Sequence, residues 1–246
     1  MTSLSSVQVR RAVERAATRT GWLSSRHSFS FGEHYDPANV GHGRLMVNND
    51  DVVTAGAGYD DHPHRDAEIV TWVLSGSLVH EDSFGHRGIV YPGLGQRMSA
   101  GSGIVHAERN DAFRLDASRP AEPVRFVQMW VRPDEAGTPP SYAQRELDLS
   151  DLGRDWVPVA SGSHSDAGVT LGARDATFWV TQLADGANRW LPEGPYVHVY
   201  IAVGAVELEA QGRLSEGDSV RLAGAGPLRV TGRGALAEVL VWVTGP

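Results

Sequence analysis

The chain contains neither cysteine nor lysine among its 246 residues. Without cysteine it cannot form a disulfide, a thiolate metal ligand or a cysteine nucleophile. Without lysine, Schiff-base chemistry and the lysine of a P-loop are both excluded. The absence of disulfides fits a reducing compartment such as the cytoplasm.

Long apolar runs and a surplus of basic charge are also absent, and this limits the partners. No stretch is apolar for long enough to span a bilayer. Residues 1–26 mix arginine and glutamate among small residues, which argues against a secretory signal. The 22 basic and 30 acidic residues give a net charge of -8, which disfavours direct binding to a nucleic-acid backbone. We therefore expect a cytoplasmic protein without membrane or nucleic-acid partners.

What the chain has is turn-forming residues and short β-rich runs. Its 28 glycines and 13 prolines favour many short strands over long helices. Only residues 8–18 and 146–152 suggest helices. The β-branched and aromatic runs predict strands at 68–74, 77–81, 126–131, 178–183, 196–203, 206–209, 219–222 and 237–243.

The segment RPDEAGTPPS at 132–141 divides these runs into two groups. It clusters proline, glycine and charge and has almost nothing to bury, as linkers do. We therefore expect two all-β domains, at 1–132 and 142–246, joined by a linker at 133–141. The two halves show no convincing sequence identity, so any internal repeat is one of fold only.

Two short clusters in the first half carry the chemistry. His62 and His64 flank Pro63, and His106 and Glu108 are likewise two residues apart. Residues i and i+2 of a strand point to the same face, so facing strands would bring three imidazoles and one carboxylate together. This donor set suits a first-row divalent metal ion. For the His-x-His pair taken alone, a pair of surface histidines is the alternative.

These clusters resemble the two motifs of the cupin superfamily, and in particular its pirin branch. The first motif falls on Gly56, His62, His64, Glu68 and Gly76, and the second on Gly95, Gly101, Gly103, His106 and Asn110. Seven residues instead of six precede Gly76, and Gly101 stands where proline is usual; both departures match pirins. The strings HPHRDAEIVTWVLSG and QRMSAGSGIVHAERN are similar to pirin segments. The resemblance is strong over 24–132.

The resemblance implies a fold and a ligand set. The fold is two tandem cupin barrels, also called double-stranded β-helices or jelly rolls, of which the first binds metal. The implied ligands are His62, His64, His106 and Glu108, with Glu68 outside the ligand set. We expect one divalent ion, Fe(II), and Ni, Cu, Zn or Mn can replace it in isolated protein because affinity order favours several of them over iron.

The resemblance also implies an activity, that of a quercetin 2,3-dioxygenase. Such an oxidoreductase opens the ring of a flavonol with O2 and releases carbon monoxide. Glu108 is the expected catalytic base. Tyr59 and Arg65 bracket the histidine pair and are the expected lining of the pocket for a small aromatic substrate. The alternative is a regulatory protein that binds a transcription factor or metabolic enzyme in a metal- or redox-dependent way.

The remaining histidines are expected to have no role at the metal. We predict surface positions for His27, His34 and His42, and exposed positions for His80 and His86 beside a hairpin. His164 and His198 are isolated from other potential ligands, so the second domain is expected to be metal-free.

Overall fold

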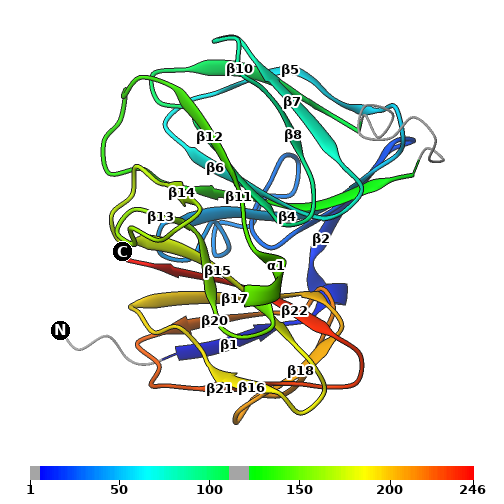
Figure 1. The fold of residues 1–246 in the computed structure, drawn as a ribbon, viewed down its shortest axis with the longest axis vertical. Helices are drawn as coiled ribbons and strands as arrows, with labels where there is room; N and C mark the ends of the chain where they lie inside the picture. Colours follow the sequence, from blue (N-terminus) through cyan, green and yellow to red (C-terminus); the bar gives the residue numbers. More distant parts are fainter. Residues whose placement is uncertain (1–5, 111–121) are drawn as a thin grey trace.

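The computed structural model describes residues 6–110 and 122–246, and these form two β-barrels stacked on one another (Figure 1). Each barrel combines a seven-stranded sheet with a four-stranded sheet. The all-β class with two tandem barrels, expected from the sequence, is confirmed.

The first barrel joins a sheet of order β12-β9-β6-β11-β4-β3-β2 to a sheet of order β5-β10-β7-β8. Its strands are β2 (Ala16–Arg19), β3 (Leu23–His27), β4 (Leu45–Val53), β5 (Gly58–His64), β6 (Glu68–Ser75), β7 (Leu78–Asp82), β8 (Arg87–Val90), β9 (Leu94–Ser99), β10 (Ile104–Arg109), β11 (Val124–Val131) and β12 (Ser141–Glu146).

The second barrel joins a sheet of order β1-β20-β17-β22-β15-β13-β14 to a sheet of order β16-β21-β18-β19. Its strands are β1 (Ser6–Arg10), β13 (Val157–Ser161), β14 (Val169–Thr170), β15 (Ala176–Leu183), β16 (Asn188–Trp190), β17 (Tyr196–Val203), β18 (Ala205–Leu208), β19 (Gly212–Ser215), β20 (Ser219–Ala223), β21 (Arg229–Gly232) and β22 (Ala237–Thr244). The helical elements among the described residues are the 3-10 turn η1 (Ala12–Glu14) and the helix α1 (Leu149–Leu152).

The expected strands are all present, but the helix expected at 8–18 is wrong. This segment contains the end of β1, the single turn η1 and the start of β2. Strand β1 is extended because it pairs along its whole length with β20, and such non-local pairing overrides local helix preference. Of 146–152, only the four residues of α1 are helical, and the carboxylate of Asp148 accepts a hydrogen bond from Ser150 N at their start.

Strand pairing crosses the expected domain boundaries twice. Strand β1 lies in the second barrel, and β12 lies at the edge of the first (Figure 1). The segment between the barrels is also attached, since Gly137 N donates to Asp66 Oδ1 at 2.7 Å and Ser102 N donates to Thr138 O at 2.8 Å. The boundaries 1–132, 133–141 and 142–246 stay a prediction, and each barrel borrows one strand across them.

The two seven-stranded sheets face each other, and their apolar side chains form a core between the barrels. On β11, Val127 and Met129 point into this core, whereas Phe126 and Gln128 point into the first barrel. Alternation along a strand produces this division. Trp242 of the second barrel completes the contact, because its Nε1–H points at the Met129 sulfur at 3.0 Å.

The interiors of the two barrels differ. One continuous apolar cluster fills the second barrel: Leu183, Leu191, Val197, Val199, Ile201, Val206, Leu208, Leu214, Val220, Leu222, Val230, Ala237, Val239 and Val241. The first barrel instead has two separate apolar clusters. One is Leu23, Val53, Val73, Leu78, Val90, Leu94, Val124 and Phe126, and the other is Ala67, Ile69, Met98, Ala100 and Ile104. Buried polar side chains occupy the first barrel as well.

An ion pair within the first barrel also makes hydrogen bonds to the second barrel. Arg125 donates to both oxygens of Asp50, at 3.0 and 2.8 Å, and also to the carbonyl oxygen of Ala202 in the second barrel. The hydroxyl of Tyr200, also from the second barrel, donates to Asp50. Burial alone would raise the pKa of Asp50, but the hydrogen bonds and charge of Arg125 outweigh it and lower this pKa below its ordinary value.

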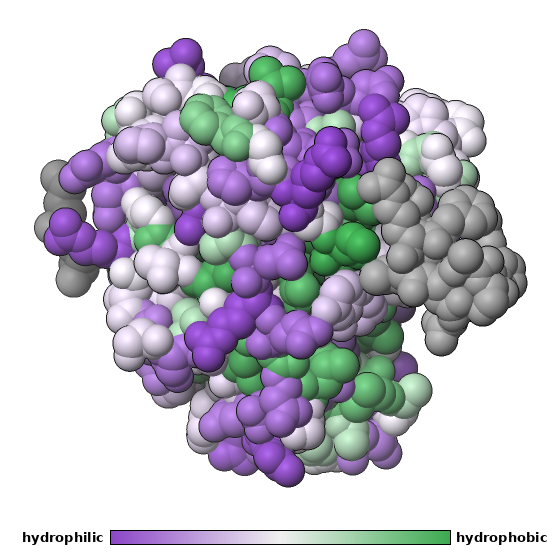
Figure 2. Space-filling view, turned by 45° about the horizontal axis from the view of Figure 1, so that its top comes forward, coloured by the Kyte–Doolittle hydropathy of each residue, from purple (hydrophilic) through white to green (hydrophobic). Residues whose placement is uncertain are grey.

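The surface is mixed in character. On the face shown in Figure 2, apolar residues form separate patches among polar ones. Among the described residues, no helix has the length and apolar character needed to cross a membrane.

Asp51 follows Asp50 on β4, so its side chain points to the other face of the strand, into the first barrel. It accepts a hydrogen bond from the Tyr59 hydroxyl at 2.9 Å. Burial raises the pKa of Asp51 to about 6, and the nearby charges of Asp50 and Glu108 act in the same direction. The folded protein therefore binds a proton here that the unfolded chain releases at lower pH.

We predict that Asp51→Asn stabilises the protein at alkaline pH and not at acid pH. A raised carboxyl pKa contributes stability below the unfolded pKa, and this contribution is lost as pH rises through about 6. At pH 8 the substitution should raise the free energy of unfolding by about 2–3 kcal/mol, at 1.36 kcal/mol per pKa unit. Urea denaturation of both proteins at pH 4 and pH 8 measures this, and an equal effect at both pH values would contradict it.

Candidate metal centre

The three histidines predicted as ligands lie together inside the first barrel. Strands β5 and β10 are antiparallel neighbours, with His106 paired to His62 and Ile104 paired to His64. The ring centroid of His62 lies 4.4 Å from that of His106 and 4.9 Å from that of His64, and the His64 and His106 rings are also 4.9 Å apart. The i, i+2 spacing in each strand therefore brings the imidazoles together.

The free nitrogens of these rings fit a metal ion. His62 Nδ1 lies 2.7 Å from the carbonyl oxygen of Asp60, which can only accept, so Nδ1 carries the proton and Nε2 keeps its lone pair. Nε2 of His64 and Nε2 of His106 are buried and have no hydrogen-bond partner. An unsatisfied buried polar atom costs about 1–3 kcal/mol. A bound cation would satisfy both atoms.

The charge state of the cluster also fits. Burial is the main cause that lowers the pKa of His64 to about 4, and the neighbouring His106 and His62 contribute to this shift. Burial likewise lowers the pKa of His106 to about 3, with His62 and His80 contributing. Both rings are neutral at pH 7, and neutral imidazole is the form that binds metals.

Glu108 lies beside the histidines, and a side chain of β11 forms a hydrogen bond with its carboxylate. Its Oε2 accepts a hydrogen bond from Gln128 Nε2 at 2.7 Å, and Gln128 Oε1 accepts one from Trp130 Nε1 at 3.1 Å. The pairing of β5 and β10 shifts register between His106 and Glu108. A carboxylate oxygen of Glu108 comes within 4.8 Å of ligand atoms of His80 and His106, whereas the group formed with His62 and His64 contains three imidazoles alone. Glu108 as a ligand stays a prediction.

Glu68 of the first motif lies elsewhere. It is buried, and its Oε2 accepts a hydrogen bond from Ser99 Oγ at 2.9 Å. Arg97 Nε lies 4.0 Å from the same oxygen. Glu68 thus has partners of its own among the strands of the seven-stranded sheet.

The prediction that His80 is exposed is wrong. Its side chain is fully buried, and its Nδ1 lies 3.3 Å from His106 Nδ1. Strand β7 pairs with β10, and this non-local pairing places His80 beside the cluster. The surface position predicted for His27 is also wrong, because its ring is buried and its Nδ1 lies 2.9 Å from Asn49 Oδ1. His86 is half-buried.

The two residues expected to line a substrate pocket lie beside different histidines of the cluster. A cavity of about 380 Å³ lies beside His64 and is lined by Arg65, together with Pro63 and Gly103. Tyr59 lies near His62, with ring centroids 5.9 Å apart, but its hydroxyl donates to Asp51 within the barrel. Contact of Tyr59 or Arg65 with a substrate stays a prediction.

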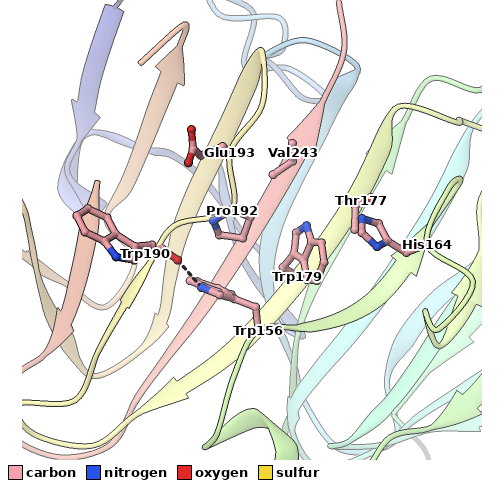
Figure 3. Close-up of a pocket in the computed structure, with 8 residues that line it drawn as sticks. All are labelled: Trp156, His164, Thr177, Trp179, Trp190, Pro192, Glu193 and Val243. Carbon is pink, nitrogen blue, oxygen red and sulfur yellow. Dashed lines mark hydrogen bonds between the residues drawn. The ribbon is translucent and has the colours of Figure 1, made fainter. Parts of the chain in front are cut away.

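The second barrel has an aromatic cavity of about 330 Å³, far from these histidines in the sequence (Figure 3). Its indoles have partners within the protein. Trp156 Nε1 donates to Trp190 O at 2.8 Å, Arg229 lies over the Trp190 ring, and His164 contacts Trp179 edge-on.

His198, also in the second barrel, is buried, and neither of its ring nitrogens has a partner. Among the described residues, the groups of three or more potential metal ligands lie in the first barrel. A metal-free second barrel stays a prediction.

The fold and the cluster together define a protein of two β-barrels with a histidine-rich centre in its first barrel. The family model described as Pirin matches residues 7–131, half of the chain. The chain belongs to the pirin family, as the two sequence motifs predicted.

Curated relatives agree with this assignment. A Mycobacterium tuberculosis protein with the name "Putative quercetin 2,3-dioxygenase" is 50% identical over 237 residues, which cover 96% of this chain and 94% of that protein. An Escherichia coli protein named quercetin 2,3-dioxygenase is 44% identical over 142 residues, 58% of each chain.

Solved structures agree as well. The crystal structure of YhhW from Escherichia coli has a TM-score of 0.87 and 31% identity, and the match covers 98% of each chain. The crystal structure of bacterial pirin YhhW in complex with nickel(II) has a TM-score of 0.86 and 31% identity, covering 98% of this chain and all of that one.

We predict one metal ion per chain, bound through the imidazoles of the first barrel. His62→Ala or His106→Ala should weaken binding by more than about 100-fold, because loss of even an outer partner of a ligand costs about 10–100-fold. His198→Ala should retain full affinity. Titration of the metal-stripped protein with nickel(II), followed by calorimetry, measures both stoichiometry and affinity. Two ions per chain, or loss of binding in His198→Ala, would contradict the assignment.

Proposed function

We propose that this chain is a mononuclear metal-dependent dioxygenase that cleaves a flavonol such as quercetin with O2. The observation that carries the proposal is the pair of unpartnered nitrogens, His64 Nε2 and His106 Nε2, grouped with His62 beside the buried carboxylate of Glu108. The names of the two curated relatives support the same reaction.

A divalent ion bound here would supply Lewis acidity to the flavonol 3-hydroxyl and a centre for reaction with O2. Glu108 accepts the proton of that hydroxyl. Gln128 donates to one oxygen of Glu108 at 2.7 Å and so fixes the direction of its carboxylate. Glu108 is only 2% exposed, and burial keeps water away from the oxygen that receives the proton.

The cavity beside His64 is the proposed place for the flavonol. Its volume of about 380 Å³ falls within the range of about 300–1,000 Å³ usual for small-molecule sites. Arg65 at its wall offers a guanidinium to the phenolic oxygens of the substrate, and Pro63 and Ile104 offer apolar surface.

Fe(II) is the proposed active ion. Neutral imidazoles and a carboxylate resemble the donors of mononuclear non-haem iron sites. Affinity order favours nickel, copper or zinc when these are abundant, so isolated protein can also hold one of them, or Mn. The nickel(II) complex of YhhW shows a relative holding such an ion.

Glu108→Gln at full iron occupancy should lower flavonol turnover by at least about 100-fold, because general base catalysis contributes about 10²–10⁴-fold. Glutamine keeps the shape of the side chain but cannot accept the proton. Oxygen uptake and loss of quercetin absorbance measure the rate. Glu68→Gln is the matched control, since it removes another buried carboxylate of the same barrel and should retain most of the activity.

The results of these assays would test separately whether Glu108 is the base, whether iron is the active ion and whether the protein is a dioxygenase. Retained turnover in Glu108→Gln would remove Glu108 as the base. If iron reconstitution gave less activity than the metal-free protein, iron would not be the active ion. Absence of turnover in the iron-loaded parent protein would contradict the dioxygenase and favour metal-dependent binding of a protein partner.

A further inference from the structure

Strand β7 carries a third i, i+2 pair, and it faces the metal cluster. His80 and Asp82 lie on β7, where Glu108 is paired with His80 and His106 with Asp82. His80 Nδ1 lies 3.3 Å from His106 Nδ1, and His80 Nε2 lies 3.3 Å from Asp82 Oδ2. The side chains of His80 and Asp82 are both 0% exposed. A buried chain of polar contacts therefore runs from Asp82 through His80 to His106.

The hydrogen bonds of Asp82 fix the direction of this chain. The backbone N–H groups of Phe84 and His86 donate to its Oδ1 at 2.9 and 3.1 Å, and His86 Nδ1 lies 2.9 Å from its Oδ2. Because these donors converge on the carboxylate, it acts as an acceptor, and His80 Nε2 donates to it. A neutral imidazole has one N–H, so His80 Nδ1 accepts from His106 Nδ1–H.

This direction leaves the lone pair of His106 on Nε2, the buried atom without a partner. His62 has the same tautomer, with Nδ1 donating to the Asp60 carbonyl oxygen and the lone pair left on Nε2. Two rings on neighbouring strands are thus both held through Nδ1 and both present Nε2. The nitrogen that binds a metal is set by the hydrogen bond of the other nitrogen.

Packing holds the His80 ring in place. The ring of Tyr142 is stacked on it, with centroids 4.7 Å apart and an angle of 22° between the planes. Tyr142 also stacks on His86 at 5.7 Å and 18°. His86 and His80 therefore both contact Asp82 and Tyr142, whereas the contact with His106 is made by His80.

We propose that Asp82 and His80 position His106 so that its Nε2 is presented to the metal. His80 is a positioning residue, since it acts through His106 and not on the substrate. The role rests on the proposed metal site and adds to it. Removing an outer hydrogen-bond partner of this kind lowers metal affinity by about 10–100-fold.

The test compares His80→Phe, His80→Asn and His86→Phe with the parent protein. Phenylalanine keeps a ring for Tyr142 but removes the acceptor. Asparagine places its Oδ1 near the position of Nδ1 and restores an acceptor for His106. We expect nickel(II) affinity to fall about 10–100-fold in His80→Phe, to recover in part in His80→Asn, and to change less than about threefold in His86→Phe, which leaves the bond between His80 and His106 intact.

A second measurement uses metal-free protein and reads the tautomer directly. Long-range ¹H–¹⁵N correlation spectra should show His106 protonated at Nδ1 in the parent protein and in His86→Phe, and a mixture of tautomers in His80→Phe. A merely structural role of His80 would not move this signature. The spectrum can be recorded even if the protein binds no metal. Absence of metal binding would contradict the proposed function, and the spectrum would still show whether His80 sets the tautomer of His106.

Three results would overturn the proposal. The first is His106 protonated at Nε2 in the parent protein, and the second is unchanged metal affinity in His80→Phe. The third is a second metal ion bound between His80, His106 and Glu108, whose ligand atoms also lie within 4.8 Å of one another. If ions occupied both metal sites at once, each ion would bind one ring nitrogen of His106, and neither nitrogen could then keep a proton. One ion per chain is therefore the expected stoichiometry.

Discussion

The packing of the two seven-stranded sheets against each other is the constraint on which the centre depends. Met129 on β11 is fully buried in the core between the barrels, in contact with Trp242 of the second barrel. Side chains alternate along a strand, so fixing Met129 on one face fixes Gln128 and Trp130 on the other. Gln128 holds Glu108, and the Trp130 ring lies edge-on against His64 at 4.7 Å. The second barrel thus positions a centre that it does not contain.

The sequence predicted the features that depend on local spacing. The i, i+2 pairs placed His62 with His64 and His106 with Glu108, and β-rich runs located the strands, because side-chain direction alternates whatever the strand pairs with. The two clusters come together because β5 pairs with β10. The resemblance to the family motifs implied that the clusters meet, whereas composition alone did not indicate it. Strand β17, expected at 196–203, has these bounds in the structure.

Features that depend on non-local pairing were not predicted. His80 looked exposed because it follows a turn, and its burial comes from the register of β7 with β10. Its i, i+2 spacing to Asp82 was a pattern that could have drawn attention to it. The segment at 8–18 was misread for the same reason, since its partner β20 lies about two hundred residues further along the chain. Local preference is weak beside such pairing.

The contrast between the barrels shows why one of them is suited to a metal. The second barrel is filled by one apolar cluster, which needs no polar partner. The first barrel buries imidazoles whose Nε2 atoms, in His64 and His106, have no partner in the protein. Each such atom costs about 1–3 kcal/mol, and apolar side chains at these positions would avoid that cost. A cation that binds the folded state and not the unfolded one would offset it and stabilise the fold. The ring nitrogens of His198 in the second barrel also lack a partner, so an unsatisfied nitrogen alone does not indicate a metal. In the first barrel His62, His64 and His106 lie together, and this grouping points to one shared ligand.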